Sequence, residues 1–257
     1  MAVIFYLSGT GNSLYAAQKA QAVLPDCRLE NIGSYLQKPY QVDDKVVGIV
    51  CPVYCFALPP VVADFVKQLQ AAPEYCFAIV TMGANAGFAL KQLRQLLASQ
   101  GIKLDYAQDI AMPDNFFAVP EFVRSRMLAA AEPKLAAMQQ KLSERVKNTE
   151  RCRSAFLWEH GGTAVGWKFI CSVLRADKPQ ADMTKCIGCG ICERICPMGN
   201  ITMEGGRPVF GSNCAVCLGC LHWCPVSAVH AGRKTINKKS RYINPNVSME
   251  EMDKVGK

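Results

Sequence analysis

The sequence predicts a doubly wound α/β domain with a five-stranded parallel sheet, followed by a small α+β domain. Short apolar runs alternate with helical patterns over residues 1–147, as expected of strands and helices in turn. Eight of the fourteen cysteines gather within residues 186–224. The 257 residues, half of them hydrophobic, suffice for one medium and one small domain.

Five short runs are expected to be strands, because strands buried on both faces of a parallel sheet are continuously apolar. They are residues 2–7, 46–51, 75–81 and 104–111, with a weaker one at 27–31. Helices are expected at 12–24, 59–70 and 87–100. Pro59 and Pro60 suit a first helical turn, and Gly101 suits a helix end.

A longer helical pattern covers residues 122–147, with Pro133 inside it, so we expect a helix that is interrupted or restarted there. Covering the sheet is the simplest role for this helix, and binding a partner is the alternative. Residues 148–178 are expected to be a linker and a short docking helix near 163–175. Residues 179–243 would form the second domain, and 244–257 a tail.

Two cysteine runs share the spacing Cys-x2-Cys-x2-Cys-x3-Cys-Pro, and the 28-residue offset between them indicates an internal duplication. This spacing is typical of two-cluster ferredoxins, in which the fourth cysteine of each run binds the other cluster. We expect two [4Fe–4S] clusters, one on Cys186, Cys189, Cys192 and Cys224, the other on Cys214, Cys217, Cys220 and Cys196. Gly188, Gly190 and Gly219 are expected to let these loops curl, so that backbone N–H groups approach the sulfurs.

Other uses of the cysteines are less favoured. Zinc ribbons use two separated Cys-x2-Cys knuckles, and a radical S-adenosylmethionine enzyme needs a Cys-x3-Cys-x2-Cys run that is absent here. The remaining six cysteines are expected to be structural. A redox disulfide between Cys51 and Cys55 is the alternative for that pair.

The first expected strand leads into a loop and then directly into a helix. A helix N-terminus offers free N–H donors and a partial positive charge, which predicts an anion site. No lysine follows, so the loop is not a Walker A motif, and Leu14 occupies the place of the last glycine in a dinucleotide fingerprint. A phosphate bound largely without a cationic side chain fits this loop, Ser8-Gly9-Thr10-Gly11-Asn12-Ser13.

This loop resembles the phosphate loop of flavodoxins, whose ligand is flavin mononucleotide (FMN). The resemblance implies that residues 8–13 hold the phosphate and that two later loops frame the flavin ring. Those loops contain Pro52, Val53, Tyr54, Cys55 and Phe56, and then Met82, Gly83, Ala84, Asn85, Gly87 and Phe88. Core packing is the alternative for Phe56 and, less so, for Tyr54. Residues 53–58 lack the glycine that flavodoxins often have, so left-handed backbone is not expected there and we expect two-electron flavin chemistry.

The domain order is similar to that of flavodoxin–ferredoxin fusion proteins of anaerobic bacteria, over residues 1 to about 243. The resemblance implies low-potential electron transfer. We expect an oxidoreductase whose flavin reduces a small-molecule acceptor with electrons from a reduced ferredoxin-type donor. A pure electron carrier that docks a partner enzyme is the alternative. No nicotinamide fingerprint occurs, and the sequence assigns no catalytic residue.

The formal charge of +8 raises nucleic acid as a partner. Two oxidised clusters and a flavin phosphate carry roughly −2 each, which reduces the loaded protein to about +2, so nucleic acid is not expected. The basic run 233–241 fits a solvated surface first, an acidic redox partner second and nucleic acid third. No apolar run approaches the roughly 18 residues of a membrane span. The N-terminus has no basic region typical of a signal peptide, so we expect a cytoplasmic protein.

Overall fold

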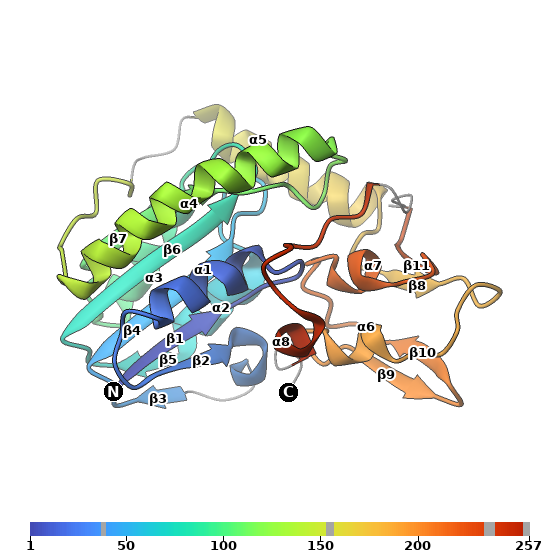
Figure 1. The fold of residues 1–257 in the computed structure, drawn as a ribbon, viewed down its shortest axis with the longest axis horizontal. Helices are drawn as coiled ribbons and strands as arrows, with labels where there is room; N and C mark the ends of the chain where they lie inside the picture. The colour runs from blue at the N-terminus through green and yellow to red at the C-terminus, as the bar shows by residue number, and fades with distance from the viewer. Residues whose placement is uncertain (37–39, 153–156, 234–239, 254–257) are drawn as a thin grey trace.

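The computed structural model describes residues 1–36, 40–152, 157–233 and 240–253, which form two parts side by side (Figure 1). The N-terminal part, the sheet domain, contains a five-stranded parallel sheet. In spatial order its strands are β2 (Cys27–Asn31), β1 (Ala2–Tyr6), β4 (Val46–Pro52), β6 (Tyr75–Met82) and β7 (Tyr106–Ala111). This flavodoxin-like order confirms the predicted fold and puts the topological switch between β1 and β4.

Helices cover both faces of the sheet. α1 (Asn12–Gln21) and α4 (Glu121–Ser143) lie on one face, and α2 (Pro60–Gln68) and α3 (Ala89–Ser99) on the other (Figure 1). Ile4 and Tyr6 of β1 pack with the first pair, whereas Val3 and Phe5 pack with the second. This burial on both faces explains the continuous apolar runs. Among the described helices, none is long and apolar enough to cross a membrane.

The helix α4 continues through Pro133, where the sequence predicted an interruption. Proline removes one backbone hydrogen bond and crowds the preceding turn. The helix nevertheless buries Ala131, Leu135, Met138 and Leu142, and each large side chain contributes about 1.5–3 kcal/mol. The packing of these side chains on the sheet therefore stabilises the helix by more than the one exposed proline destabilises it.

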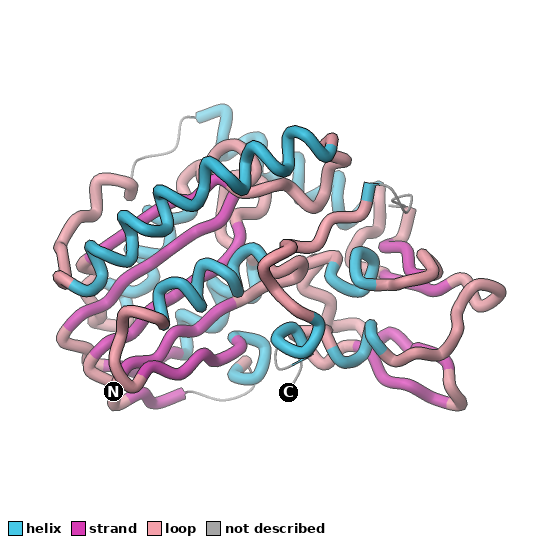
Figure 2. The backbone as a smooth tube through the Cα atoms, in the orientation of Figure 1, coloured by secondary structure: helices cyan, strands magenta, loops and turns pink. Residues whose placement is uncertain are grey.

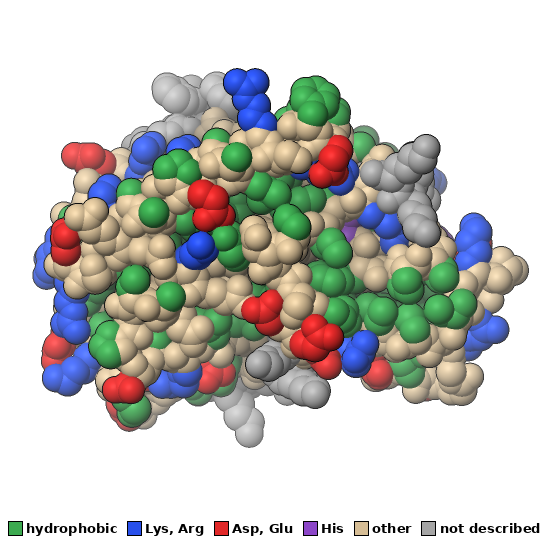
Figure 3. Space-filling view, viewed as in Figure 1, with side chains coloured by type: hydrophobic (Ala, Val, Ile, Leu, Met, Phe, Trp, Pro, Cys, Tyr) green, Lys and Arg blue, Asp and Glu red, His purple; other side chains and the backbone are tan. Residues whose placement is uncertain are grey.

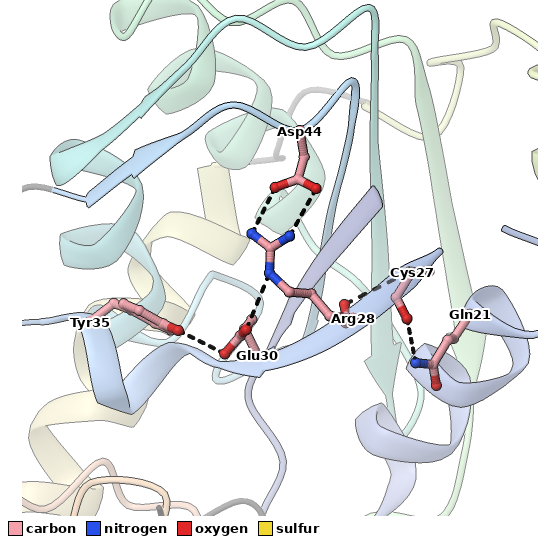
Figure 4. Close-up of polar contacts among 6 residues, drawn as sticks. All are labelled: Gln21, Cys27, Arg28, Glu30, Tyr35 and Asp44. Atoms are coloured by element: carbon pink, nitrogen blue, oxygen red, sulfur yellow. Dashed lines mark hydrogen bonds and ion pairs between the residues drawn. The ribbon is translucent and has the colours of Figure 1, made fainter. Parts of the chain in front are cut away.

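Polar contacts hold the edge strand β2 in place (Figure 4). The guanidinium of Arg28 donates to both carboxylate oxygens of Asp44, at 2.8 and 2.7 Å, and lies 3.3 Å from Glu30. Glu30 also accepts a hydrogen bond of 2.7 Å from the Tyr35 hydroxyl. The sequence missed the neighbouring elements, the 3₁₀ helix η1 (Ile32–Tyr35) and the pair of short strands β3 (Tyr40–Val42) and β5 (Leu69–Ala71).

The connection between the two parts is shorter than expected. The carbonyl oxygen of Asn148 accepts a 2.9 Å hydrogen bond from the backbone N–H of Ala107, and Cys152 is buried in the sheet domain. The docking helix, α5 (Leu157–Lys168), begins earlier than predicted and continues into a π-helical segment (Phe169–Val173). Residues 153–156 of the expected linker lie outside the described residues.

The C-terminal part repeats one arrangement after 28 residues. Its elements are β8 (Pro179–Ala181), α6 (Ile191–Arg194), β9 (Ile201–Glu204), β10 (Arg207–Phe210), α7 (Gly219–Trp223) and β11 (Val229–Ala231). β8 pairs with β11 and β9 with β10, so each strand pair takes one strand from each half. This exchange supports the predicted internal duplication.

Residues 240–253, expected to belong partly to a tail, form a strap that returns to the sheet domain (Figures 1 and 2). Asn244 and Met252 are fully buried, and Val247 joins the core that contains α1. The strap ends in the short helix α8 (Met249–Asp253). Of the expected basic run and tail, residues 234–239 and 254–257 lie outside the described part of the chain.

Candidate redox site

The eight clustered cysteines line two separate cavities. The outer cysteine cavity contains Cys186, Cys189, Cys192 and Cys224. The inner cysteine cavity contains Cys196, Cys214, Cys217 and Cys220. Each cavity takes three cysteines from one run and the fourth from the other, which is the predicted grouping. Within the described residues, no three His, Cys, Asp or Glu side chains are placed to hold a single metal ion.

The backbone of the two cysteine runs follows the same 28-residue repeat. Each run has three residues with positive φ at equivalent places: Gly188 (68°), Gly190 (72°) and Gly199 (57°), and Val216 (57°), Leu218 (59°) and Ser227 (58°). These left-handed residues curl each run around its cavity. The same shape therefore exists in both halves, although only the first half uses glycine at these places.

Backbone N–H groups point at cysteine sulfurs in both halves. The N–H of Asn200 donates to the Cys196 Sγ at 3.3 Å, and the N–H of Ala228 donates to the Cys224 Sγ at 3.2 Å. Such bonds stabilise thiolates and tune the potential of a cluster. Four cysteines in each cavity, with an N–H group directed at Cys224 in the outer one and at Cys196 in the inner one, fit the predicted [4Fe–4S] ligation.

The prediction that Gly219 curls the second loop is wrong, because Leu218 adopts the left-handed conformation instead. Gly219 begins α7 and is needed for another reason. A Cβ at this position would stand 2.9 Å from the carbonyl oxygen of Gly9 and 3.1 Å from Ile195. Glycine here permits close approach of the cysteine loop to the sheet domain.

Burial controls the protonation of the cysteine thiols in the absence of iron. It raises the pKa of Cys192 and of Cys214 to about 11 each. Burial raises the pKa of Cys217 and Cys220 further still. At neutral pH these thiols hold their protons, so metal binding has to displace them and releases protons.

The predicted phosphate loop lies between β1 and α1, as expected. The hydroxyls of Ser8, Thr10 and Ser13 are buried, and Gly11 has a φ of 95°. The N–H of Gly11 donates to the Ser8 Oγ at 3.2 Å, and the Ser13 Oγ lies 2.8 Å from the Oγ1 of Thr81. The first N–H groups of α1 have no partner within the helix. These donors fit a phosphate without a cationic side chain.

The inner cysteine cavity lies directly against this phosphate loop. The Asn115 amide donates to the Thr10 Oγ1 at 3.3 Å and to the Cys217 carbonyl oxygen at 3.2 Å. The indole N–H of Trp223 donates to the Gly9 carbonyl oxygen at 3.1 Å. A Cβ on Gly9 would collide with the Cys217 carbonyl. Sequence reasoning missed Asn115, because nothing in its local pattern distinguishes it from other loop amides.

A second contact joins the inner cavity to the edge of the sheet. The Asn31 amide donates to the carbonyl oxygen of Pro197 at 2.7 Å. A Cβ on Gly33 would collide with the same carbonyl. Since Pro197 follows Cys196, two of the four cysteines of the inner cavity are flanked by the sheet domain.

The second predicted loop forms a tight hairpin turn over Tyr54–Ala57, with backbone hydrogen bonds of 2.9 and 3.0 Å between those two residues. Cys55 and Phe56 have φ values of 47° and 66°, so the expectation that this glycine-free loop avoids left-handed backbone is wrong. Such turns match the twist of the flanking chain. The Phe56 carbonyl also accepts a 2.9 Å hydrogen bond from the N–H of Phe88, which brings the second and third predicted loops together.

Helix α5 covers this turn, which the sequence did not predict. The Thr163 hydroxyl donates to the Cys55 carbonyl oxygen. Gly166 allows close packing, since a Cβ there would lie 3.1 Å from the Cys55 Sγ. The ring of Trp167 stacks on that of Tyr54 with centroids 6.2 Å apart and an interplanar angle of 17°. The predicted flavin-ring loop is therefore shielded by one helix.

The C-terminal strap covers the phosphate loop from another side. The Tyr242 hydroxyl and the Asn244 amide both donate to the Asn12 Oδ1, at 2.6 and 3.0 Å. The N–H of Asn244 donates to the Thr10 carbonyl oxygen at 2.8 Å. His222 is buried beside the strap. Its Nδ1 accepts from the N–H of Tyr242 at 3.0 Å, so Nε2 carries the proton that is donated to the Asn115 carbonyl at 2.7 Å.

Comparison with known proteins identifies one segment of the second part. The family model of a 4Fe-4S binding domain matches residues 179–202. A search of curated proteins found no significant match. Among solved structures, Megasphaera elsdenii flavodoxin is 22% identical with a TM-score of 0.34, covering 51% of this chain and 99% of its own. An FMN-dependent NADH-azoreductase from Bacillus anthracis is 13% identical with a TM-score of 0.39, covering 55% of this chain and 99% of its own.

Because both TM-scores are low, the fold assignment rests on the strand order of the sheet. The assignment of the second part rests on the matched segment and on the two cysteine cavities. The chain therefore joins a flavodoxin-like sheet domain to a 4Fe–4S binding domain.

Proposed function

We propose that the chain transfers electrons between two [4Fe–4S] clusters, one in each cysteine cavity, and an FMN held by residues 8–13. Each cluster exchanges one electron at a time and a flavin exchanges one or two, so together they interconvert one-electron and two-electron transfer. One observation carries the proposal: the Asn115 side chain hydrogen-bonds both Thr10 in the phosphate loop and Cys217 in the inner cavity.

Residues at the contact between the two parts hold the phosphate loop close to the inner cavity. Gly9 and Gly219 let the two loops approach, and Trp223 and Asn115 fix them with hydrogen bonds. These contacts hold the phosphate end of the FMN beside the inner cavity, while the electrons are carried by its ring. Burial, followed by the charges of Cys217 and Cys214, raises the pKa of Tyr54, so the loop expected to face the ring also lies near the inner cavity. The arrangement supports the inner cavity as the neighbour of the flavin.

We further propose that the flavin reduces a small-molecule acceptor, with a reduced ferredoxin-type protein as donor. Helix α5 packs on Cys55 and stacks Trp167 on Tyr54, at the loop expected to face the flavin ring. A partner protein would have to displace this helix to reach the ring, whereas a small molecule would not. The cover over this loop therefore favours a small acceptor over a carrier that presents its flavin edge.

Anaerobic purification with quantified iron, sulfide and flavin tests the proposal. We expect about eight iron, eight sulfide and one FMN per chain. After rapid mixing of the loaded protein with a reductant, the absorbance of the iron–sulfur clusters and that of the flavin should both change. Zinc in place of iron would contradict the cluster assignment, and a chain without flavin would contradict the FMN site.

A further inference from the structure

We infer that Arg241 raises the reduction potential of both proposed clusters, an inference that rests on the proposed function. Arg241 lies at the start of the C-terminal strap, and its side chain reaches the segment from Cys220 to Cys224. This segment supplies one cysteine to the inner cavity, Cys220, and one to the outer cavity, Cys224. One cation therefore lies beside a ligand of each cluster.

Within the described residues, the guanidinium of Arg241 donates only to backbone carbonyl oxygens. It donates to the carbonyl oxygen of Leu221, to that of Cys224 at 3.1 Å and to that of Val229 at 3.4 Å. Val229 and Cys224 line the outer cavity, and Leu221 adjoins Cys220 of the inner one. The buried Nε has no hydrogen-bond partner in the described part of the chain. No described carboxylate therefore neutralises this cation.

The sheet domain holds the backbone of Arg241 in place. The buried side chain of Arg124, on α4, donates to the carbonyl oxygens of Ser240 and Arg241, at 2.8 and 2.9 Å. The Arg124 guanidinium also lies over the Tyr242 ring, 5.6 Å from its centroid. On the other side, the N–H of Tyr242 donates to His222. These contacts keep the charge of Arg241 at one place beside the cysteines.

Other charged groups near the cavities are exposed or paired. Among the described residues, no Lys, Arg, Asp or Glu lines either cavity. Arg207 lies on the outer cysteine loop, but it is exposed and faces Glu204 in the β9–β10 pair. Asp177 lies near the inner cavity and 3.8 Å from Lys178. Figure 3 shows Lys and Arg side chains at the margin of the hydrophobic C-terminal part. Solvent screens such charges more than that of Arg241.

A half-buried cation favours the more negative state of a redox group beside it. An oxidised four-thiolate cluster carries roughly −2, and each electron gained adds one negative charge without making or breaking a bond. Burial lowers the pKa of Arg241, while the negative charges of Cys224 and then Cys220 raise it. Arginine nevertheless keeps its charge in proteins. Because Arg241 attracts the added charge on both clusters, it opposes their mutual repulsion when two electrons are held for the flavin.

A redox titration of the loaded protein without oxygen, with dithionite as reductant and EPR as readout, tests the inference. Arg241→Gln removes the charge, whereas Arg241→Lys keeps it. We expect the equilibrium constant for cluster reduction to fall about tenfold or more in Arg241→Gln, which is about 59 mV for one electron. Arg241→Lys should stay close to the original potential. Arg126→Gln is the control for net charge and should match the original chain, since Arg126 is exposed on α4 and lines neither cavity.

The two variants at Arg241 separate its charge from its support of the fold. A structural role at the end of α7 would affect both alike, because both lose the fork of donors that a guanidinium provides. An unchanged potential in Arg241→Gln, or an equal fall in Arg241→Lys, would overturn the inference. Loss of iron and sulfide from both Arg241→Gln and Arg241→Met would also overturn it, because Arg241 would then be needed for cluster binding. An original chain that binds no clusters would instead overturn the proposed function.

Discussion

The contact between Gly9 and Cys217 gives a direct test of how the two parts are joined. In Gly9→Ala the new methyl would collide with the Cys217 carbonyl oxygen and stand 3.0 Å from its Cβ. Relaxed carbon contacts are about 3.5–4.0 Å, so the two loops must separate. Overpacking of this kind costs about 1–3 kcal/mol. Loss of the hydrogen bond from Trp223 to Gly9 adds about 1 kcal/mol. We expect a loss of about 2–4 kcal/mol in the free energy of unfolding.

Urea unfolding of the loaded protein without oxygen measures this loss, and rapid reduction measures the rate at which electrons reach the flavin. Gly101→Ala is the control, because Gly101 has a φ of 75° and no atom within 4 Å of an added Cβ. Gly101→Ala therefore adds only backbone strain, which costs about 1–2 kcal/mol, and should leave the electron-transfer rate unchanged. A Gly9→Ala protein with the original stability and the original rate would refute the contact between the two loops.

Three other predictions concern pH, the strap and α4. Burial raises the pKa of Cys51 from its ordinary 9.0 to about 12. The stability that Cys51 contributes is therefore present below pH 9 and falls towards pH 12, by up to about 1.4 kcal/mol per pH unit. Cys51→Val should lose less stability between pH 8 and pH 10 in urea unfolding, and an equal loss would contradict this reasoning. Asn244→Ala should destabilise the strap by about 1–3 kcal/mol and speed amide hydrogen exchange of residues 8–13, because a buried amide is lost. Unchanged exchange there would show that the strap does not hold the loop. Pro133→Ala should stabilise the chain by about 1–3 kcal/mol in thermal unfolding, since an exposed proline is removed from a continuous helix, and a lower stability would argue against that continuity.

Features that depend on residues close in sequence were predictable. The spacing of the cysteines fixes which four share a cavity, and the structure groups Cys224 with the first run and Cys196 with the second. The weak strand at 27–31 matches β2, although Arg28 and Glu30 make it poorly apolar. The strand is recognised from its own segment. The exchange of the fourth cysteine between the runs was predictable because the repeated spacing is typical of two-cluster ferredoxins.

Features that depend on distant residues were not predictable. Asn115 joins two loops about a hundred residues away on either side, and no local pattern marks an amide that will do so. Tyr242 and Asn244 are ordinary loop residues until the strap brings them to Asn12. The turn at Cys55 breaks a local rule because contacts with Phe88 and Thr163 hold it in place. Each of these positions is decided by tertiary packing.

The two cysteine runs share one backbone shape but differ in what maintains it. In the first cysteine run (Cys186–Cys196), glycines adopt the left-handed conformation without strain, whereas in the second run (Cys214–Cys224) Val216 and Leu218 are held in the same conformation. Each of those residues costs roughly 1–2 kcal/mol there, and valine is branched at Cβ. Packing of the sheet domain on Cys217 and Gly219 is at hand to compensate for this strain. The consequence is a difference in dependence: glycines alone permit the shape of the first run, whereas the strained shape of the second run relies on packing against the sheet domain.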